Sequence, residues 1–193
     1  MKFGTHVSAA GGLDKTFERA HNVDAEVFQY FSRPPQGGKA PEITPELAAN
    51  FKAERSKYKI NDYYIHTPYF INLASADSRI RHGSVSVISE ELKRGNLLGF
   101  KYVNTHIGSA GEQTMKEGIA AVVKGLIAIL DKHEGSTELL IELSAGAGKI
   151  IGAKFEDIAT ILEGVDAKHK GKLNVCFDTA HAFASGYDLR TAD

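Results

Sequence analysis

Short apolar runs alternate along the chain with longer segments in which apolar residues recur every three or four positions. The short runs predict six β-strands, at residues 2–7, 26–31, 62–66, 101–106, 138–142 and 173–178. The longer segments predict five helices, at residues 12–21, 44–58, 77–98, 112–133 and 154–165. Strict alternation of strand and helix favours a parallel sheet with right-handed crossover connections.

The number of strand–helix units limits which architectures are possible. Six units are too few for a closed barrel of eight. We therefore expect an α/β fold of barrel type with about six of eight β/α units, an incomplete barrel in a single domain spanning residues 1–193. An open doubly wound sheet would instead carry a G-x-G-x-x-G turn after the first strand, and the SAAGG segment at residues 8–12 lacks that spacing.

Five residues with metal-binding side chains follow the predicted strands or end them: His66, His106, Glu142, Asp178 and His181. The carboxyl ends of parallel barrel strands meet at one face, so we expect these side chains to converge. Imidazole nitrogens and carboxylate oxygens are good ligands for zinc and similar ions. Each residue alone is more often a structural one, but their shared placement at strand ends favours a metal centre.

Composition adds little about partners and more about the compartment. The formal net charge is -1 and the isoelectric point is near 6.7, so a nucleic-acid partner would have to be held by a local patch. Cys176 is the only cysteine, which excludes a disulfide within the chain and favours a reducing compartment. There is no apolar segment of signal-peptide or membrane-span length, so we expect a cytoplasmic protein without membrane contact.

Four motifs resemble those of the endonuclease IV family of apurinic/apyrimidinic endonucleases. They are GTHVSAAGG at residues 4–12, HTPYFINL at 66–73, NTHIGS at 104–109 and DTAHAFASGYD at 178–188. The resemblance covers essentially the whole chain in order. It implies a TIM barrel that holds three zinc ions and hydrolyses the backbone of double-stranded DNA on the 5′ side of an abasic site.

The resemblance also implies a role for each candidate ligand. His66 and His106 would bind a first zinc, and Glu142 would bridge that zinc to a second and act as the catalytic residue. Asp178 would bind the second zinc and His181 the third. The family takes its remaining ligands from later strands, so fewer than three zinc ions are expected in this chain.

DNA contacts follow from the same resemblance. Tyr69 matches a residue that the family inserts at the abasic gap, and the loop after the second strand offers Arg33 and Lys39 as phosphate contacts. The family usually has an Arg and an aromatic residue in that loop, whereas this chain has no Trp. Leu143 stands where the family commonly has a polar side chain, which predicts weaker support for Glu142.

Two alternatives from other classes stay open. A metal-dependent sugar isomerase or epimerase would also place His, Glu and Asp at strand ends. A truncated or degenerate relative would bind metal or DNA without catalysis. For any of these functions, the first and sixth strands of this 193-residue chain would leave unpaired edges around an apolar interior. This predicts self-association through those edges or poor solubility, and little endonuclease activity for the chain alone.

Overall fold

Six parallel strands lie side by side in the order in which they occur along the chain. The computed structural model describes residues 1–165, 169–170 and 172–191. Its strands are β1 Gly4–His6, β2 Val27–Phe31, β3 Asp62–His66, β4 Tyr102–Thr105, β5 Glu138–Glu142 and β6 Leu173–Cys176. Parallel pairing in sequential order is the arrangement of a barrel, and it confirms the predicted barrel-type sheet with six β/α units.

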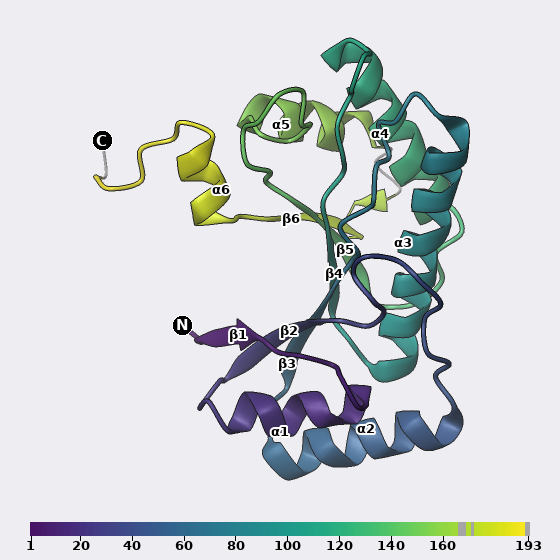
Figure 1. Cartoon of the computed structure of the whole chain (residues 1–193), viewed down its shortest axis with the longest axis vertical. Helices are drawn as coiled ribbons and strands as arrows, with labels where there is room; N and C mark the ends of the chain where they lie inside the picture. The colour runs from purple at the N-terminus through teal and green to yellow at the C-terminus, as the bar shows by residue number, and fades with distance from the viewer. Residues whose placement is uncertain (166–168, 171, 192–193) are drawn as a thin grey trace.

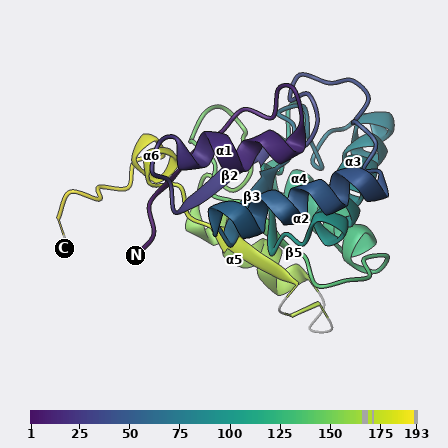
Figure 2. The same ribbon diagram turned by 90° about the horizontal axis from the view of Figure 1, so that it is seen from below.

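Helices cover the outer side of the sheet (Figure 1). They are the 3₁₀ helix η1 Leu13–Lys15 and the α-helices α1 Thr16–His21, α2 Pro45–Tyr58, α3 Ser78–Leu98, α4 Met115–Leu130, α5 Phe155–Gly164 and α6 Thr179–Ala184. Helices α1 and α2 pack next to each other on the outer side of β2 and β3, below these strands in Figure 1 and in front of them in Figure 2. The N-terminus and helix α6 lie on the side of the molecule away from α3 (Figure 1).

Local sequence explains where the long helices begin and end. Thr44 caps α2 by accepting a hydrogen bond from the Leu47 backbone, and Thr114 and Glu117 form a capping box at the start of α4. Helix α3 ends at Gly99, which has a φ of 76° that glycine adopts without strain.

The two faces of the sheet differ in polarity. Strand residues that alternate along the chain point to the helices and form the core, among them Phe28, Tyr63, Ile65, Val103 and Ile141. Their neighbours point inward, and one row around the sheet runs through Gln29, Tyr64, Tyr102 and Glu138. Leu140 and Cys176 line the same inner face, so the expected apolar interior is instead a mixture of polar and apolar side chains.

The ends of the sheet are the outer sides of β1 and β6. Within the described part of the chain, β1 pairs only with β2, and β6 pairs only with β5. In that same part, no helix is long and apolar enough to cross a membrane.

Candidate metal centre

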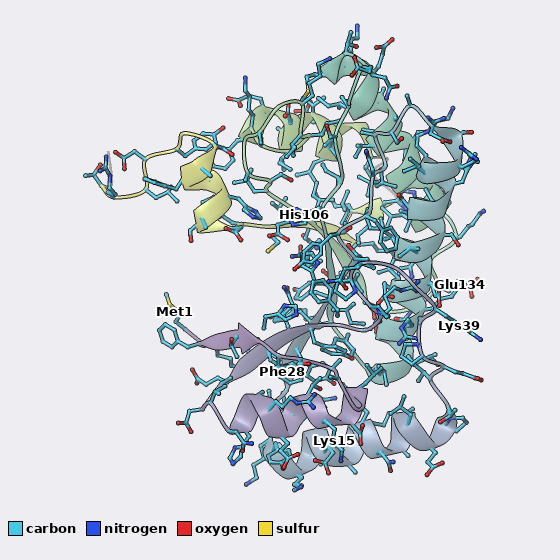
Figure 3. All side chains as sticks on the ribbon, in the orientation of Figure 1. Met1, Lys15, Phe28, Lys39, His106 and Glu134 are labelled. Carbon is cyan, nitrogen blue, oxygen red and sulfur yellow. The ribbon has the colours of Figure 1, made fainter. Side chains whose placement is uncertain are left out.

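The carboxyl ends of the strands bring the five predicted ligands together. His66 and Glu142 end β3 and β5, His106 follows β4, and Asp178 and His181 lie at the start of α6. They form two groups that share Glu142, and within each group the ligand atoms lie within 4.8 Å of one another. Figure 3 shows His106 beside the segment that joins β6 to α6, and its ring centroid is 5.4 Å from that of His181.

The two carboxylate oxygens of Glu142 face different groups. Its Oε2 lies 3.2 Å from His66 Nε2 and 3.8 Å from His106 Nε2, and its Oε1 lies 3.4 Å from His181 Nδ1. Burial by itself would raise the pKa of Glu142, but the hydrogen bond from His66 and the nearby His106 outweigh it and hold the pKa below its usual value. The group is therefore an ionised carboxylate between imidazoles.

Backbone carbonyls fix the orientation of two of the rings. His66 Nδ1 donates to the Thr67 carbonyl at 2.6 Å, and His181 Nδ1 donates to the Leu143 carbonyl at 2.8 Å. A carbonyl can only accept, so Nδ1 of each ring carries a proton and Nε2 is the nitrogen left to bind a cation. At His66 this nitrogen lies 3.2 Å from Glu142 Oε2, so the two atoms could share one cation.

These donors fit a zinc ion. With zinc–ligand bonds of about 2.0–2.1 Å in a tetrahedron, ligand atoms lie roughly 3.3–3.5 Å apart. The separations of 3.2 and 3.8 Å between Glu142 Oε2 and the two imidazoles bracket that value. Burial lowers the pKa of His106, which keeps its ring neutral and able to bind. Three protein ligands with a fourth position open are typical of catalytic zinc.

Asp178 also has a structural role. Strand β6 ends at Cys176, and Asp178 caps the unpredicted helix α6 because its Oδ1 accepts from the His181 backbone N–H at 2.8 Å. Its Oδ2 lies 3.7 Å from His181 Nδ1. The cap orients the second oxygen toward the shared centre, and both side chains are partly exposed to solvent.

Asn104 is a neighbour of the centre that the sequence reasoning missed. Its Nδ2 donates to Glu142 Oε2 at 2.5 Å, and it is 3% exposed. The alternation of strand residues could have identified it, because Asn104 lies two positions before His106 and shares its face. The expected weak support of Glu142 at Leu143 concerns a side chain in the core, whereas Asn104 supplies a hydrogen bond from another strand.

Cys176 stands beside Glu142 in the sheet register but is a poor ligand. Burial, together with the charges of Glu142 and Asp178, raises the pKa of its thiol to about 11. Metal binding requires the thiolate, so Cys176 stays a protonated neighbour.

Tyr69 lies at the rim of the centre and is 64% exposed. Its ring centroid is 5.1 Å from that of Phe31 and 6.2 Å from that of His66. Its backbone N–H donates to the Pro35 carbonyl at 3.2 Å, which ties it to the loop after β2. A largely exposed aromatic ring thus lies beside the candidate ligand His66.

The structure corrects the prediction for Arg33. Its side chain is buried and pairs with Glu91 at 2.5 Å and Glu90 at 2.7 Å, both on α3. A guanidinium already neutralised inside the protein cannot also contact a phosphate at the surface. Lys39 is exposed, and Figure 3 shows it at the side of the molecule away from His106. A phosphate contact by Lys39 stays a prediction.

Comparison with known proteins identifies the family. The profile of the family described as xylose isomerase-like TIM barrel matches residues 17–193. A protein of Methanoculleus marisnigri named probable endonuclease 4 is 40% identical over 193 residues, which are 98% of this chain and 67% of that relative. The chain belongs to the endonuclease IV family. The crystal structure of endonuclease IV from Thermus thermophilus superposes with a TM-score of 0.82 at 30% identity, covering 97% of this chain and 66% of that structure.

Membership in the endonuclease IV family agrees with the barrel-type sheet. The chain spans about two thirds of the length of the relatives that it matches. A D-tagatose 3-epimerase-like protein also superposes, with a TM-score of 0.72 at 19% identity over 94% of this chain and 66% of that structure. At that identity the likeness concerns the fold alone.

Proposed function

We propose that this protein is a zinc-dependent endonuclease that hydrolyses the phosphodiester on the 5′ side of an abasic site in double-stranded DNA. The observation that carries the proposal is the placement of Glu142 between His66 and His106 on one side and His181 on the other. Family membership supports the nuclease activity. The donor set supports zinc.

The residues of the centre suit phosphodiester hydrolysis. Bound zinc would supply a hydroxide nucleophile near neutral pH and stabilise the negative charge that builds on the phosphate. His66 and His106 present imidazole nitrogens to Glu142, and the Thr67 carbonyl fixes the orientation of His66; Glu142 contributes one negative charge shared by both groups. His181 is oriented by the Leu143 carbonyl, so its Nε2 is free for a ligand beyond the Glu142 pair.

A cavity beside the centre supports a nucleotide-sized ligand. Its volume is about 480 Å³, and its lining includes Tyr69, Phe70, Asn72, His106 and His181. Cavities of this size hold small organic ligands. In the proposal, Tyr69 enters the gap in the duplex, as wedge side chains do in other DNA-binding proteins, while Lys39 contacts phosphate.

Substitution of Glu142 tests the proposal. Glu142→Gln keeps the size of the side chain but removes its charge, so we expect loss of tightly bound zinc and of cleavage, with DNA binding largely retained. Glu138→Gln is the matched control, because Glu138 begins the same strand and faces the same side. Zinc content is measured on this chain. Cleavage of a duplex with one abasic site is measured on a form of the protein that includes all eight barrel strands.

Three outcomes would contradict the proposal. The first is a wild-type chain purified without chelator that holds no stoichiometric metal. The second is equal cleavage of abasic DNA by the wild type and Glu142→Gln. The third is turnover of a ketose sugar without cleavage of DNA, which would favour the epimerase alternative.

A further inference from the structure

Asn104 holds the shared carboxylate of the candidate metal centre in place. It lies in β4 on the inner face of the sheet, and Asn104 Nδ2 donates to Glu142 Oε2. This is the same oxygen that faces His66 and His106. We propose that Asn104 is a positioning residue, which acts on zinc through Glu142 and does not itself bind the ion.

The geometry explains why an amide donor suits this position. The last torsion of a glutamate side chain is broad and soft, so a carboxylate with no fixed partner rotates freely. A carboxylate oxygen accepts in two directions, and Asn104 occupies one direction at Oε2. The other direction stays available for an ion that His66 and His106 also reach.

The orientation of the Asn104 amide is fixed by chemistry. The reverse orientation would set Asn104 Oδ1 against Glu142 Oε2 at 2.5 Å, with two acceptors facing each other. With Nδ2 on Glu142, Asn104 Oδ1 is buried and has no hydrogen-bond partner among the described residues. Buried polar atoms normally find partners, so an amide that served packing alone would satisfy both ends. Because Asn104 Oδ1 has no partner, we infer that the hydrogen bond from Asn104 Nδ2 to Glu142 is the reason for an asparagine at this position.

The side chain can be changed without moving the nearest ligand. The Asn104 carbonyl accepts from the Thr67 backbone N–H at 2.9 Å, and Thr67 Oγ1 bonds Thr105 Oγ1 at 2.7 Å. These contacts hold the end of β3, including His66, and none of them uses the Asn104 side chain. A substitution at Asn104 therefore acts first on Glu142.

The chain offers a matched control. Asn174 lies on the inner face of β6, and its Nδ2 donates to Glu138 Oε2 at 2.8 Å. It is the same residue type, bonded in the same way to a carboxylate outside the centre. Asn104→Leu and Asn174→Leu each remove one hydrogen bond from an amide to a carboxylate, buried in the first case and exposed in the second, and only the first concerns the metal.

The test measures zinc affinity by competition with a chromophoric chelator, beside thermal unfolding of the zinc-free chain. We expect Asn104→Leu to weaken zinc binding by about 10- to 100-fold, the usual effect of losing a partner of a ligand. Asn174→Leu should bind zinc as the wild type does. Substituted Co²⁺ gives a second readout, because its visible spectrum should change in Asn104→Leu and not in Asn174→Leu. If Asn104→Leu does not fold, Asn104→Ser removes the same donor with a smaller side chain.

The inference rests on the proposed zinc site, and the outcomes separate the two. If Glu142→Gln loses zinc while Asn104→Leu and Asn104→Ser keep wild-type affinity, the inference is overturned and the site stands. If Asn104→Leu and Asn174→Leu lose affinity equally, the effect is structural and the inference is also overturned. A wild-type chain without affinity for zinc would contradict the site and, with it, the role of Asn104.

Discussion

Single residues decide the charge of the candidate metal centre. His66 and His181 are oriented by backbone carbonyls, and His106 is kept neutral by burial, which lowers its pKa. Glu142 stays ionised among them because neighbouring imidazoles hold its pKa below the usual value against the effect of burial. Neutral imidazoles and one carboxylate are the protonation states that a divalent ion requires.

Acidification should therefore release the metal. Protons compete with zinc for imidazole nitrogen, so we expect zinc affinity to fall as the pH drops below about 6.5, the ordinary histidine value. The competition titration, repeated from pH 8 to pH 5, measures this. Affinity that is unchanged or higher at pH 5 would show that His66 and His106 are not ligands.

The zinc-free chain should lose stability in the same direction. His106 has a lower pKa in the folded chain than in the unfolded chain, so the unfolded state binds more protons and stability rises with pH. The contribution is present above about pH 6.5 and is lost as the pH falls through the lowered value. Urea unfolding at several pH values measures it, and stability that increases on acidification would contradict the sign.

Tyr69 should affect recognition without affecting the metal. Tyr69→Ala removes an exposed ring beside the centre, so affinity for a duplex with an abasic site should weaken by at most a few kcal/mol, the scale of unstacking one base step. Tyr69→Phe keeps the ring and should bind as the wild type does. Fluorescence anisotropy with abasic and intact duplexes measures the difference. Loss of zinc in Tyr69→Ala would show that the residue supports the centre instead.

At the scale of elements, helix α3 anchors the loop after β2. Arg94 donates to the Ser32 carbonyl at 2.8 Å and to the Pro41 carbonyl at 2.6 Å, so one side chain holds both ends of the loop. Glu91 accepts hydrogen bonds from Ser32 and Arg33 within the same buried group. The loop that carries Lys39 is thus tied to the helical layer.

Removal of this anchor should loosen the loop. Arg94→Met fills similar space but cannot hold the two carbonyls, and it leaves Glu91 with fewer partners, so we expect a loss of stability of about 3–5 kcal/mol. Arg94→Lys should recover only part of it, because an ammonium lacks the planar fork. Limited proteolysis should cut within residues 32–41 before the rest of the variant chain. A cleavage pattern equal to that of the wild type would contradict the anchoring role.

The elements were predictable to the extent that their causes are local. All six strands and the long helices follow from apolar periodicity and caps, within a few residues of the predicted bounds. Helix α6 was not predicted because it is short and because the carboxylate of its cap, Asp178, was interpreted only as a metal ligand. Arg33 was misread because its partners lie about sixty residues later on α3, and no local pattern shows such a pairing. Asn104 was missed because its hydrogen-bond partner, Glu142, lies on another strand, and no local sequence pattern indicates such a contact.

At the scale of the whole molecule, one group of exposed apolar side chains lies on β6, α6 and the segments beside them. Its members are Val175, Phe177, Phe183 and Leu189, which are all exposed. Exposed apolar surface that collects in one region promotes association. These four side chains form an apolar patch that would favour self-association.

We expect this chain to self-associate through that patch. Phe183→Ser should shift sedimentation toward the monomer across a concentration series, because it removes an exposed ring from the patch. Leu97→Ser is the control, since Leu97 is equally exposed, at 56%, but lies on α3. A wild-type chain that sediments as a stable monomer at all concentrations would rule out the association.

The position of Glu142 also bears on the order in which ions are taken up. One carboxylate faces two ligand groups, so occupancy of one group is thermodynamically linked to occupancy of the other. A second divalent ion would meet a negative charge that is already shared and a cation nearby, and reciprocity requires each ion to weaken the other by the same factor. Uptake would then proceed in two separated steps. The supply of free zinc would decide whether the protein carries one ion or two.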